Sequence, residues 1–148
     1  RLLRLFGNTT SSKVIPSVGA EQEYFLVDRE KYLKRKDLVF TGRTLFGAMP
    51  PKGQELDDHY FGTIRQRVAS YMKDVNEELW NSALQQRHST TKWHLHSTNL
   101  HRSMQANIAV DHNQIIMKTL KKVACEHGLK CLLHEKPFAG VNGSGKHN

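Results

Sequence analysis

Two glutamates separated by one residue, Glu21 and Glu23, lie in a stretch whose other residues favour an extended chain. In a strand, residues i and i+2 point to the same face, so the two carboxylates would lie side by side. Neighbouring carboxylates repel each other, and a divalent cation with oxygen ligands relieves that repulsion. The spacing therefore indicates a cation site, and a solvent-facing strand edge is the alternative that gives the same pattern.

A second candidate site is the glycine loop, which we define as residues 138–147. Gly140 to Lys146 fits G-x-x-x-x-G-K, the beginning of a phosphate-binding Walker A loop. The next residue should be Ser or Thr to hold magnesium, but it is His147, and no helix follows to point its N-terminus at a phosphate. We therefore expect a loop whose glycines allow close backbone approach to a ligand, with His147 as a metal ligand or a proton carrier.

A third group is the set of histidines around Trp93, namely His88, His94, His96 and His101. His-x-His on a strand would place the imidazoles of His94 and His96 on one face, which suits zinc. No Cys, Asp or Glu lies nearby to complete such a site, so the spacing alone does not establish one.

Short elements are predicted before residue 63. Residues 1–6 are typical of the end of a helix, closed by Gly7. Residues 14–27 are rich in Val, Ile, Tyr and Phe and predict extended chain, followed by a short polar helix over 29–36. Residues 40–62 contain so many Gly and Pro that they predict a structured loop.

Two longer helices and a strand are predicted after residue 62. Over 63–80, apolar residues fall on one stripe, at Ile64, Val68, Met72, Val75 and Leu79. The second helix, 107–127, ends at Gly128 and is expected to bury Ile108, Ile115, Ile116, Leu120, Val123 and Ala124. Lys130–Leu133 is expected to form a short strand.

The composition predicts one soluble globular domain. The 148 residues are 38% hydrophobic and 24% charged, and no apolar run approaches the length of about 20 residues that spans a bilayer. The sequence has no initiator Met and no recognisable signal peptide, so we expect it to begin within a longer protein. Cys125 and Cys131 lie six residues apart, which indicates reduced thiols in a cytoplasmic protein.

The net charge of +8 raises a competing hypothesis, a small basic nucleic-acid-binding module. The basic residues are scattered, however, and the densest group, Lys31 to Lys36, is interleaved with Tyr32 and Leu33 as on a solvated face. Nucleic acid is therefore not the expected partner. A salt-dependent mobility shift with generic DNA would favour this alternative.

Five stretches of the sequence are distinctive: GAEQEYFLVD (19–28), TGRTLFG (41–47), PKGQELDDHYFG (51–62), NIAVDHNQ (107–114) and HEKPFAGVNGSGKH (134–147). Together they resemble glutamine synthetase of the type III class. The second and third are particular to type III, and Ala20 departs from the proline usual in the family. The resemblance implies an α+β fold, part of the catalytic domain, in which an antiparallel sheet carries metal carboxylates and helices pack behind it.

The resemblance also implies a chemistry. The family makes glutamine from glutamate, ammonia and ATP through γ-glutamyl phosphate, with Mg²⁺ or Mn²⁺ at the phosphates. It implies that Glu23 binds the metal on the glutamate and ammonia side, and that Glu21 and His147 bind the metal that orients ATP. Asn142 and Gly143 would hold glutamate, and the parent enzyme would form a ring-shaped homo-oligomer in the cytoplasm. No single residue is identified as catalytic.

The family pattern vanishes between Trp80 and Asn107, where the family has a segment like KTQHNEVAPAQHELAPIYA. Reading a coding sequence for that segment one nucleotide out of register, with codons chosen to fit, spells residues 87–104 of this chain, and Gln105 if a purine follows. Genuine divergence of the segment is the competing explanation. We therefore expect 81–105 to be out of frame and poorly ordered, and its histidines to be an accident of translation. Two metal-binding glutamates would be lost with it, so we expect the chain, as a fragment of residues 1–148, to be inactive by itself.

Overall fold

The computed structural model describes residues 1–48, 64–84, 86–92, 96–101 and 104–147, and for 86–104 it describes the backbone only. Its helices are α1 (Leu2–Leu5), α2 (Arg29–Leu33), α3 (Lys36–Thr41), α4 (Gln66–Asn81) and α5 (Ala106–Glu126). Its strands are β1 (Ser17–Val18), β2 (Glu21–Asp28), β3 (Gln86–Lys92), β4 (His96–His101), β5 (Met104–Gln105), β6 (Leu129–Leu132) and β7 (Lys146–His147). The predicted loop at 40–62 and the stretch at 51–62 lie largely outside the described residues.

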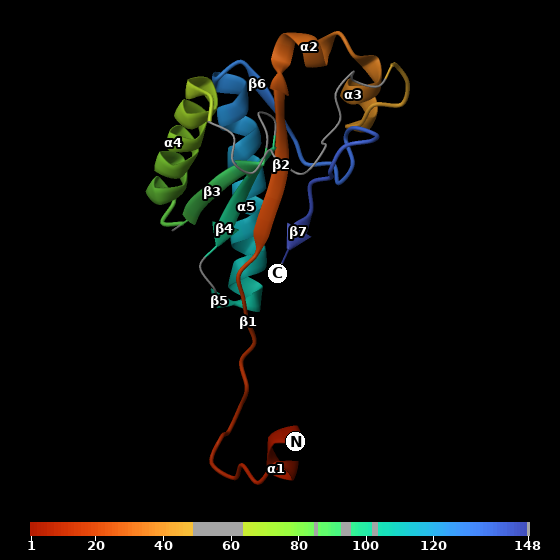
Figure 1. Ribbon diagram of the computed structural model, residues 1–148. Coiled ribbons are helices and arrows are strands. Elements are labelled where there is room, and N and C mark those ends of the chain that lie inside the picture. The colour runs from red at the N-terminus through yellow and green to blue at the C-terminus, as the bar shows by residue number, and fades with distance from the viewer. Residues whose placement is uncertain (49–63, 85, 93–95, 102–103, 148) are drawn as a thin grey trace.

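Strand β2 is the centre of the main sheet. The order is β3-β4-β2-β6, with β7 also paired to β2, and every pairing is antiparallel. Strand β4 runs along one side of β2, opposite 21–25, while β7 and β6 share its other side, opposite 21–22 and 25–28. Helices α4 and α5 lie together on one side of this sheet (Figure 1). The predicted α+β fold, with an antiparallel sheet and packed helices, is confirmed.

The main core joins β2 to the two long helices. Alternate β2 residues Tyr24 and Leu26 are buried with Tyr71 of α4 and Leu120 of α5. The ring of Tyr71 meets that of Tyr24 edge-on at 6.1 Å, and its hydroxyl donates to the Leu120 carbonyl at 3.2 Å. Edge-to-face aromatic pairs and satisfied hydroxyls both stabilise such a core. This packing fixes which face of β2 points away from the helices.

Both predicted long helices are confirmed, and a few residues differ from the expected burial. Val68, Met72, Val75 and Leu79 of α4 are buried as expected, but Ile64 precedes the helix and is exposed. In α5, the expected burial of Ile108 and Ile115 is wrong, since both are more than 40% exposed. Ile116, Leu120, Val123 and Ala124 are buried as expected, and Ala109 and Asn113 complete the buried stripe.

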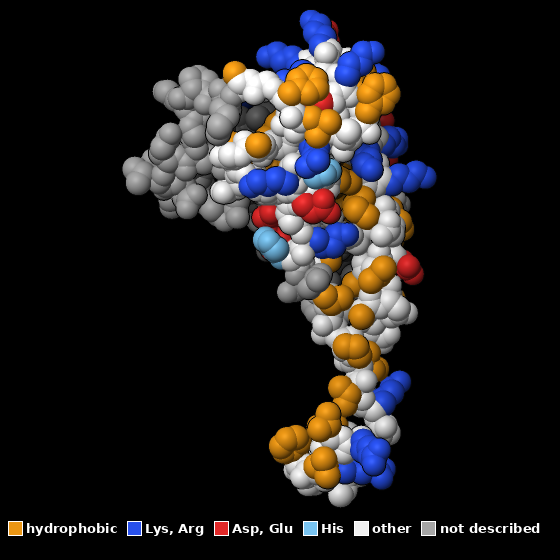
Figure 2. All heavy atoms as spheres, turned by 90° about the vertical axis from the view of Figure 1, so that its right-hand side faces the viewer, with side chains coloured by type: hydrophobic (Ala, Val, Ile, Leu, Met, Phe, Trp, Pro, Cys, Tyr) orange, Lys and Arg blue, Asp and Glu red, His pale blue; other side chains and the backbone are white. Residues whose placement is uncertain are grey.

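Glycines follow the first and the last helix, and the first helix lies on an extended arm. Gly7, with φ of +81°, follows α1, and Gly128, with φ of +64°, follows α5, as a helix stop requires. Leu5 and Phe6 are about 80% exposed, at 79% and 83%, on an arm that extends away from the sheet (Figures 1 and 2). In the described part of the chain, no helix has both the length and the apolar character to cross a membrane.

Candidate metal centre

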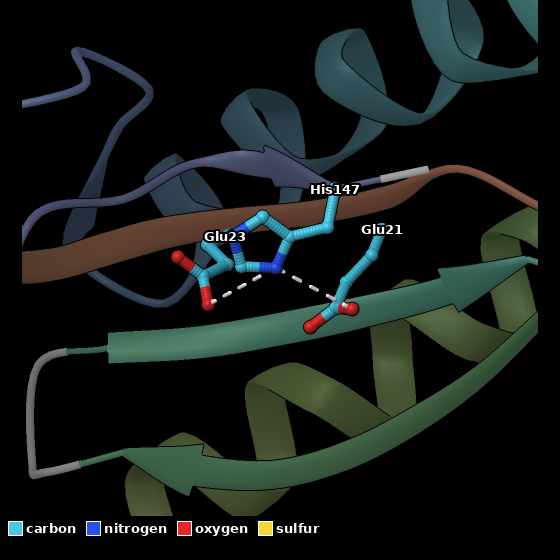
Figure 3. Close-up of side chains that lie close together, drawn as sticks. All are labelled: Glu21, Glu23 and His147. Carbon is cyan, nitrogen blue, oxygen red and sulfur yellow. Dashed lines mark ion pairs between the residues drawn. The ribbon is translucent and has the colours of Figure 1, made fainter.

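Strand register brings three predicted ligands to one face. Glu21 and Glu23 are i and i+2 in β2, and Glu21 is paired directly with His147 of β7. Residues paired across antiparallel strands share a face, so all three side chains project from the same side of the sheet. Figure 3 shows the His147 ring between the two carboxylates. We call this group the cation site (Glu21, Glu23 and His147).

The distances at the cation site suit one small ion. His147 Nδ1 lies 3.6 Å from Glu21 Oε2 and 4.0 Å from Glu23 Oε1. One ligand atom from each residue lies within 4.8 Å of the others. Adjacent ligands held about 2.1 Å from an octahedral ion lie about 3.0 Å apart, so binding a cation here requires each ligand atom to move by about 1 Å or less. Two carboxylates and an imidazole are a donor set that Mn²⁺ or Mg²⁺ accepts.

The three ligands differ in exposure. The side chain of Glu23 is 5% exposed, that of Glu21 29% and that of His147 59%. A buried carboxylate needs hydrogen-bond donors or positive charge around it, because moving a charged group out of water is costly. Glu23 receives one such hydrogen bond from the backbone N–H of Gly145, which donates to Glu23 Oε2 at 2.8 Å. The buried end of the site is therefore fixed and the His147 end faces solvent.

The glycine loop is laced to β2 through Gly145. Besides donating to the Glu23 carboxylate, Gly145 accepts a hydrogen bond from the Glu23 N–H at 3.0 Å. A β-carbon on Gly145 would lie 3.0 Å from His147 Nε2 and 3.6 Å from Glu23 Oε2. Glycine at this position therefore lets the backbone approach the carboxylate and the imidazole closely.

A neighbouring network holds the TGRTLFG stretch against the start of the glycine loop. Thr44 donates from both its N–H and its hydroxyl to the Pro137 carbonyl, at 2.8 and 3.2 Å. Buried Asp37 accepts from Arg35, at 2.6 Å, and from the Leu45 N–H, at 3.0 Å. The Arg35 guanidinium, followed by the backbone N–H groups of Leu45 and Leu38, holds the pKa of Asp37 well below its usual range. The sequence does not predict this network, because Arg35 belongs to a basic group that is typical of a solvated face.

The remaining predicted residues occupy the same loop. Asn142 is exposed and Gly143 is half-buried, just before the Gly145 contact with Glu23. The last two residues of the loop, Lys146 and His147, form β7 rather than the start of a helix, which distinguishes the loop from a Walker A loop. The side chains of His88, His94, His96 and His101 lie outside the described residues, so the zinc hypothesis stays untested.

Strand β4 borders the cation site on the side away from β7. Its backbone register pairs Glu21 with Leu100 and Glu23 with Thr98. Neither is an acid, and residues 81–105 contain no Asp or Glu at all. Among the described residues, Glu21, Glu23 and His147 therefore form the only group of three or more His, Cys, Asp or Glu side chains that lie close enough together to hold a metal ion.

Comparisons with known proteins give a consistent match. The family model for the glutamine synthetase catalytic domain matches residues 2–148. The chain is 51% identical to a glutamine synthetase of Butyrivibrio fibrisolvens, over 100% of this chain and 21% of that protein. It is 50% identical to the type-3 glutamine synthetase of Dictyostelium discoideum, over 95% and 19%, and 43% identical to a glutamine synthetase of Bacteroides fragilis, over 93% and 19%. The chain thus spans about a fifth of the length of these curated relatives.

Proposed function

This chain belongs to the type III class of the glutamine synthetase family, and we propose that it carries part of the cation site of a glutamate–ammonia ligase. The observation that carries the proposal is the convergence of two carboxylates and an imidazole from β2 and β7. Such a ligase joins glutamate and ammonia at the expense of ATP. These substrates, a ring-shaped homo-oligomer and a cytoplasmic location are proposed for the parent enzyme.

Each residue of the proposed site has a role set by its surroundings. When bound, Mg²⁺ or Mn²⁺ would neutralise phosphate charge and polarise the transferred group. Glu23, held by the Gly145 N–H, would keep one carboxylate in a fixed position on the glutamate and ammonia side. Glu21 and His147, which face each other across the β2–β7 pair, would bind the ion at the ATP phosphates. Asn142 and Gly143 would lie along the glutamate.

We further propose that this chain does not synthesise glutamine by itself. Its sheet offers Leu100 and Thr98 where β4 passes the two glutamates, and 81–105 supply no carboxylate. A phosphoryl-transfer site with too few acidic ligands binds its divalent ion weakly, and without the bound ion the charge of the phosphates would not be neutralised. A measurable rate of glutamine formation by the purified chain would refute this.

The change of reading frame over 81–105 remains our explanation for the missing carboxylates. The structure assigns β3 and β4 within this segment, and this neither supports nor opposes the frame change. The coding DNA is the direct check, because a compensated slip would restore a Glu-Val-Ala-Pro-containing peptide in another frame. If no alternative frame encodes such a peptide, the segment has diverged instead.

Cation binding is tested by titrating the purified chain with Mn²⁺ and measuring the loss of the free-ion signal by electron paramagnetic resonance. We expect at least one site per chain, and about a tenfold or greater loss of affinity in Glu23→Gln. Glu77→Gln is the matched control, because Glu77 is exposed on α4 and forms an ion pair with Lys73, at 3.5 Å. Equal Mn²⁺ binding by all three proteins, or none by the unmodified chain, would contradict the proposal.

A further inference from the structure

Ser144 is a buried polar residue that lies next to the cation site and has no role in the proposed function. It is 2% exposed, although it belongs to a loop whose neighbours Asn142 and Lys146 are exposed. Buried hydroxyls are retained where they have partners, since an unpaired one is costly. Ser144 satisfies both of its donors, and both bonds go to the same short segment.

The two bonds of Ser144 connect the glycine loop to the end of the β6 segment. Its hydroxyl donates to the His134 carbonyl at 2.7 Å, and its N–H donates to the Glu135 carbonyl at 2.8 Å. Residues 134 and 135 follow β6, which is itself paired to β2. The loop is thus fastened to the sheet through a segment that is separate from the strands carrying the ligands.

The residue after Ser144 transmits this attachment to the cation site. Gly145 donates to the Glu23 carboxylate at 2.8 Å and accepts from the Glu23 N–H at 3.0 Å. His147 follows two residues later and is in register with Glu21. A shift of Ser144 would therefore displace the donor that orients Glu23 and the strand that presents His147.

We infer that Ser144 is a positioning residue for cation binding, which acts through Gly145 on Glu23 and His147. This rests on the proposed function, since it presumes that the cation site binds a divalent ion. Removing the hydroxyl leaves the His134 carbonyl without its donor and loosens the loop, whereas the main core, built from β2, α4 and α5, does not include Ser144. Loss of a partner that orients metal ligands lowers metal affinity by about 10–100-fold.

The test compares Mn²⁺ affinity and stability in Ser144→Ala, Ser144→Thr and a matched serine control. Ser82→Ala serves as the control, because the Ser82 hydroxyl also donates to a backbone carbonyl, that of Glu78 at 3.1 Å, at the end of α4. We expect about a tenfold weaker Mn²⁺ affinity in Ser144→Ala, recovery to within about threefold in Ser144→Thr, and no change in Ser82→Ala. The metal-free Ser144→Ala protein should still unfold cooperatively in urea, because Ser144 lies outside the main core.

The outcomes separate this inference from the proposed function. If the unmodified chain does not bind Mn²⁺, the proposed function fails and the inference falls with it. If the unmodified chain binds and Ser144→Ala binds equally well, only the positioning role is overturned. Weak binding that tracks a loss of the fold, or that Ser144→Thr fails to restore, would make Ser144 a general structural residue and would likewise overturn the inference.

Discussion

Replacement of Gly143 by alanine tests how tightly the glycine loop is fitted to the sheet. A β-carbon at Gly143 would lie 2.4 Å from the Glu135 carbonyl oxygen, whereas ordinary contacts begin at 3.4 Å. The obstructing atom belongs to the backbone, so it cannot rotate away as a side-chain end would. One of the two segments must therefore move by about 1 Å.

That movement has consequences at the cation site. The Glu135 carbonyl accepts the Ser144 N–H at 2.8 Å, and the next N–H, that of Gly145, lies 2.8 Å from Glu23 Oε2. A displacement of about 1 Å takes both bonds beyond the length at which they stabilise the loop. Metal–ligand distances tolerate only about 0.2 Å. We therefore predict at least about a tenfold rise in the Kd for Mn²⁺, which corresponds to about 1.4 kcal/mol.

The assay is a Mn²⁺ titration of Gly143→Ala, followed by paramagnetic resonance, with circular dichroism as the check that the fold persists. Gly7→Ala is the control for a glycine substitution in general. Gly7 has a left-handed φ of +81°, and a β-carbon added there would meet no heavy atom within 4 Å, so alanine is strained but unobstructed. We expect Gly7→Ala to bind Mn²⁺ normally. Unchanged affinity in a folded Gly143→Ala protein would refute the reasoning.

Three further predictions concern stability and thiol chemistry. Leu120→Ala should lower the free energy of unfolding by about 2–5 kcal/mol in urea, because Leu120 is fully buried, while Val110→Ala on the exposed face of α5 should change it little; equal losses would contradict the core assignment. Burial raises the pKa of the Cys131 thiol from 9.0 to about 12, so the thiol ionises first in the unfolded chain and the free energy of unfolding should fall as the pH rises from 9 towards 12. At pH about 8, a thiol reagent should label exposed Cys125 but not buried Cys131. The pKa of Asp37 is lowered from 3.8, so the stability that its carboxylate contributes is fully present above that pH and is lost on acidification. Between about pH 6 and pH 3, the urea midpoint of Asp37→Asn should therefore fall less than that of the unmodified chain. Equal falls would show that the Asp37 carboxylate does not stabilise the fold.

The strand that carries the two glutamates and the two long helices could be predicted because their signals are local. The i, i+2 spacing of Glu21 and Glu23 fixes their common face once the segment is a strand, and the apolar period fixes α4. Alternation within β2 likewise places Tyr24 on the face opposite the two glutamates, and the packing of α4 and α5 buries it there. The convergence of His147 with the two glutamates follows only from the family resemblance, since nothing in the spacing pairs residue 147 with residue 21.

The parts that the sequence does not predict depend on long-range contacts. Asp37 looks like an ordinary charged residue of a polar helix, and only folding brings Arg35 and the Leu45 N–H around it. Similarly, Ser144 is indistinguishable from a loop serine until the His134 carbonyl is placed next to it. The error at Ile108 has a different cause, because several apolar residues of α5 fit the helical period and packing decides which stripe is buried.

The central claim is that β2 and β7 together bind divalent cations through Glu21, Glu23 and His147. The most direct measurement is the anomalous difference density of a crystal of this chain soaked in Mn²⁺. We predict at least one peak at these side chains, with ligand atoms of Glu23, or of Glu21 and His147, about 2.0–2.4 Å from it. A map with no peak there, or an experimental structure in which these three side chains diverge, would contradict the account.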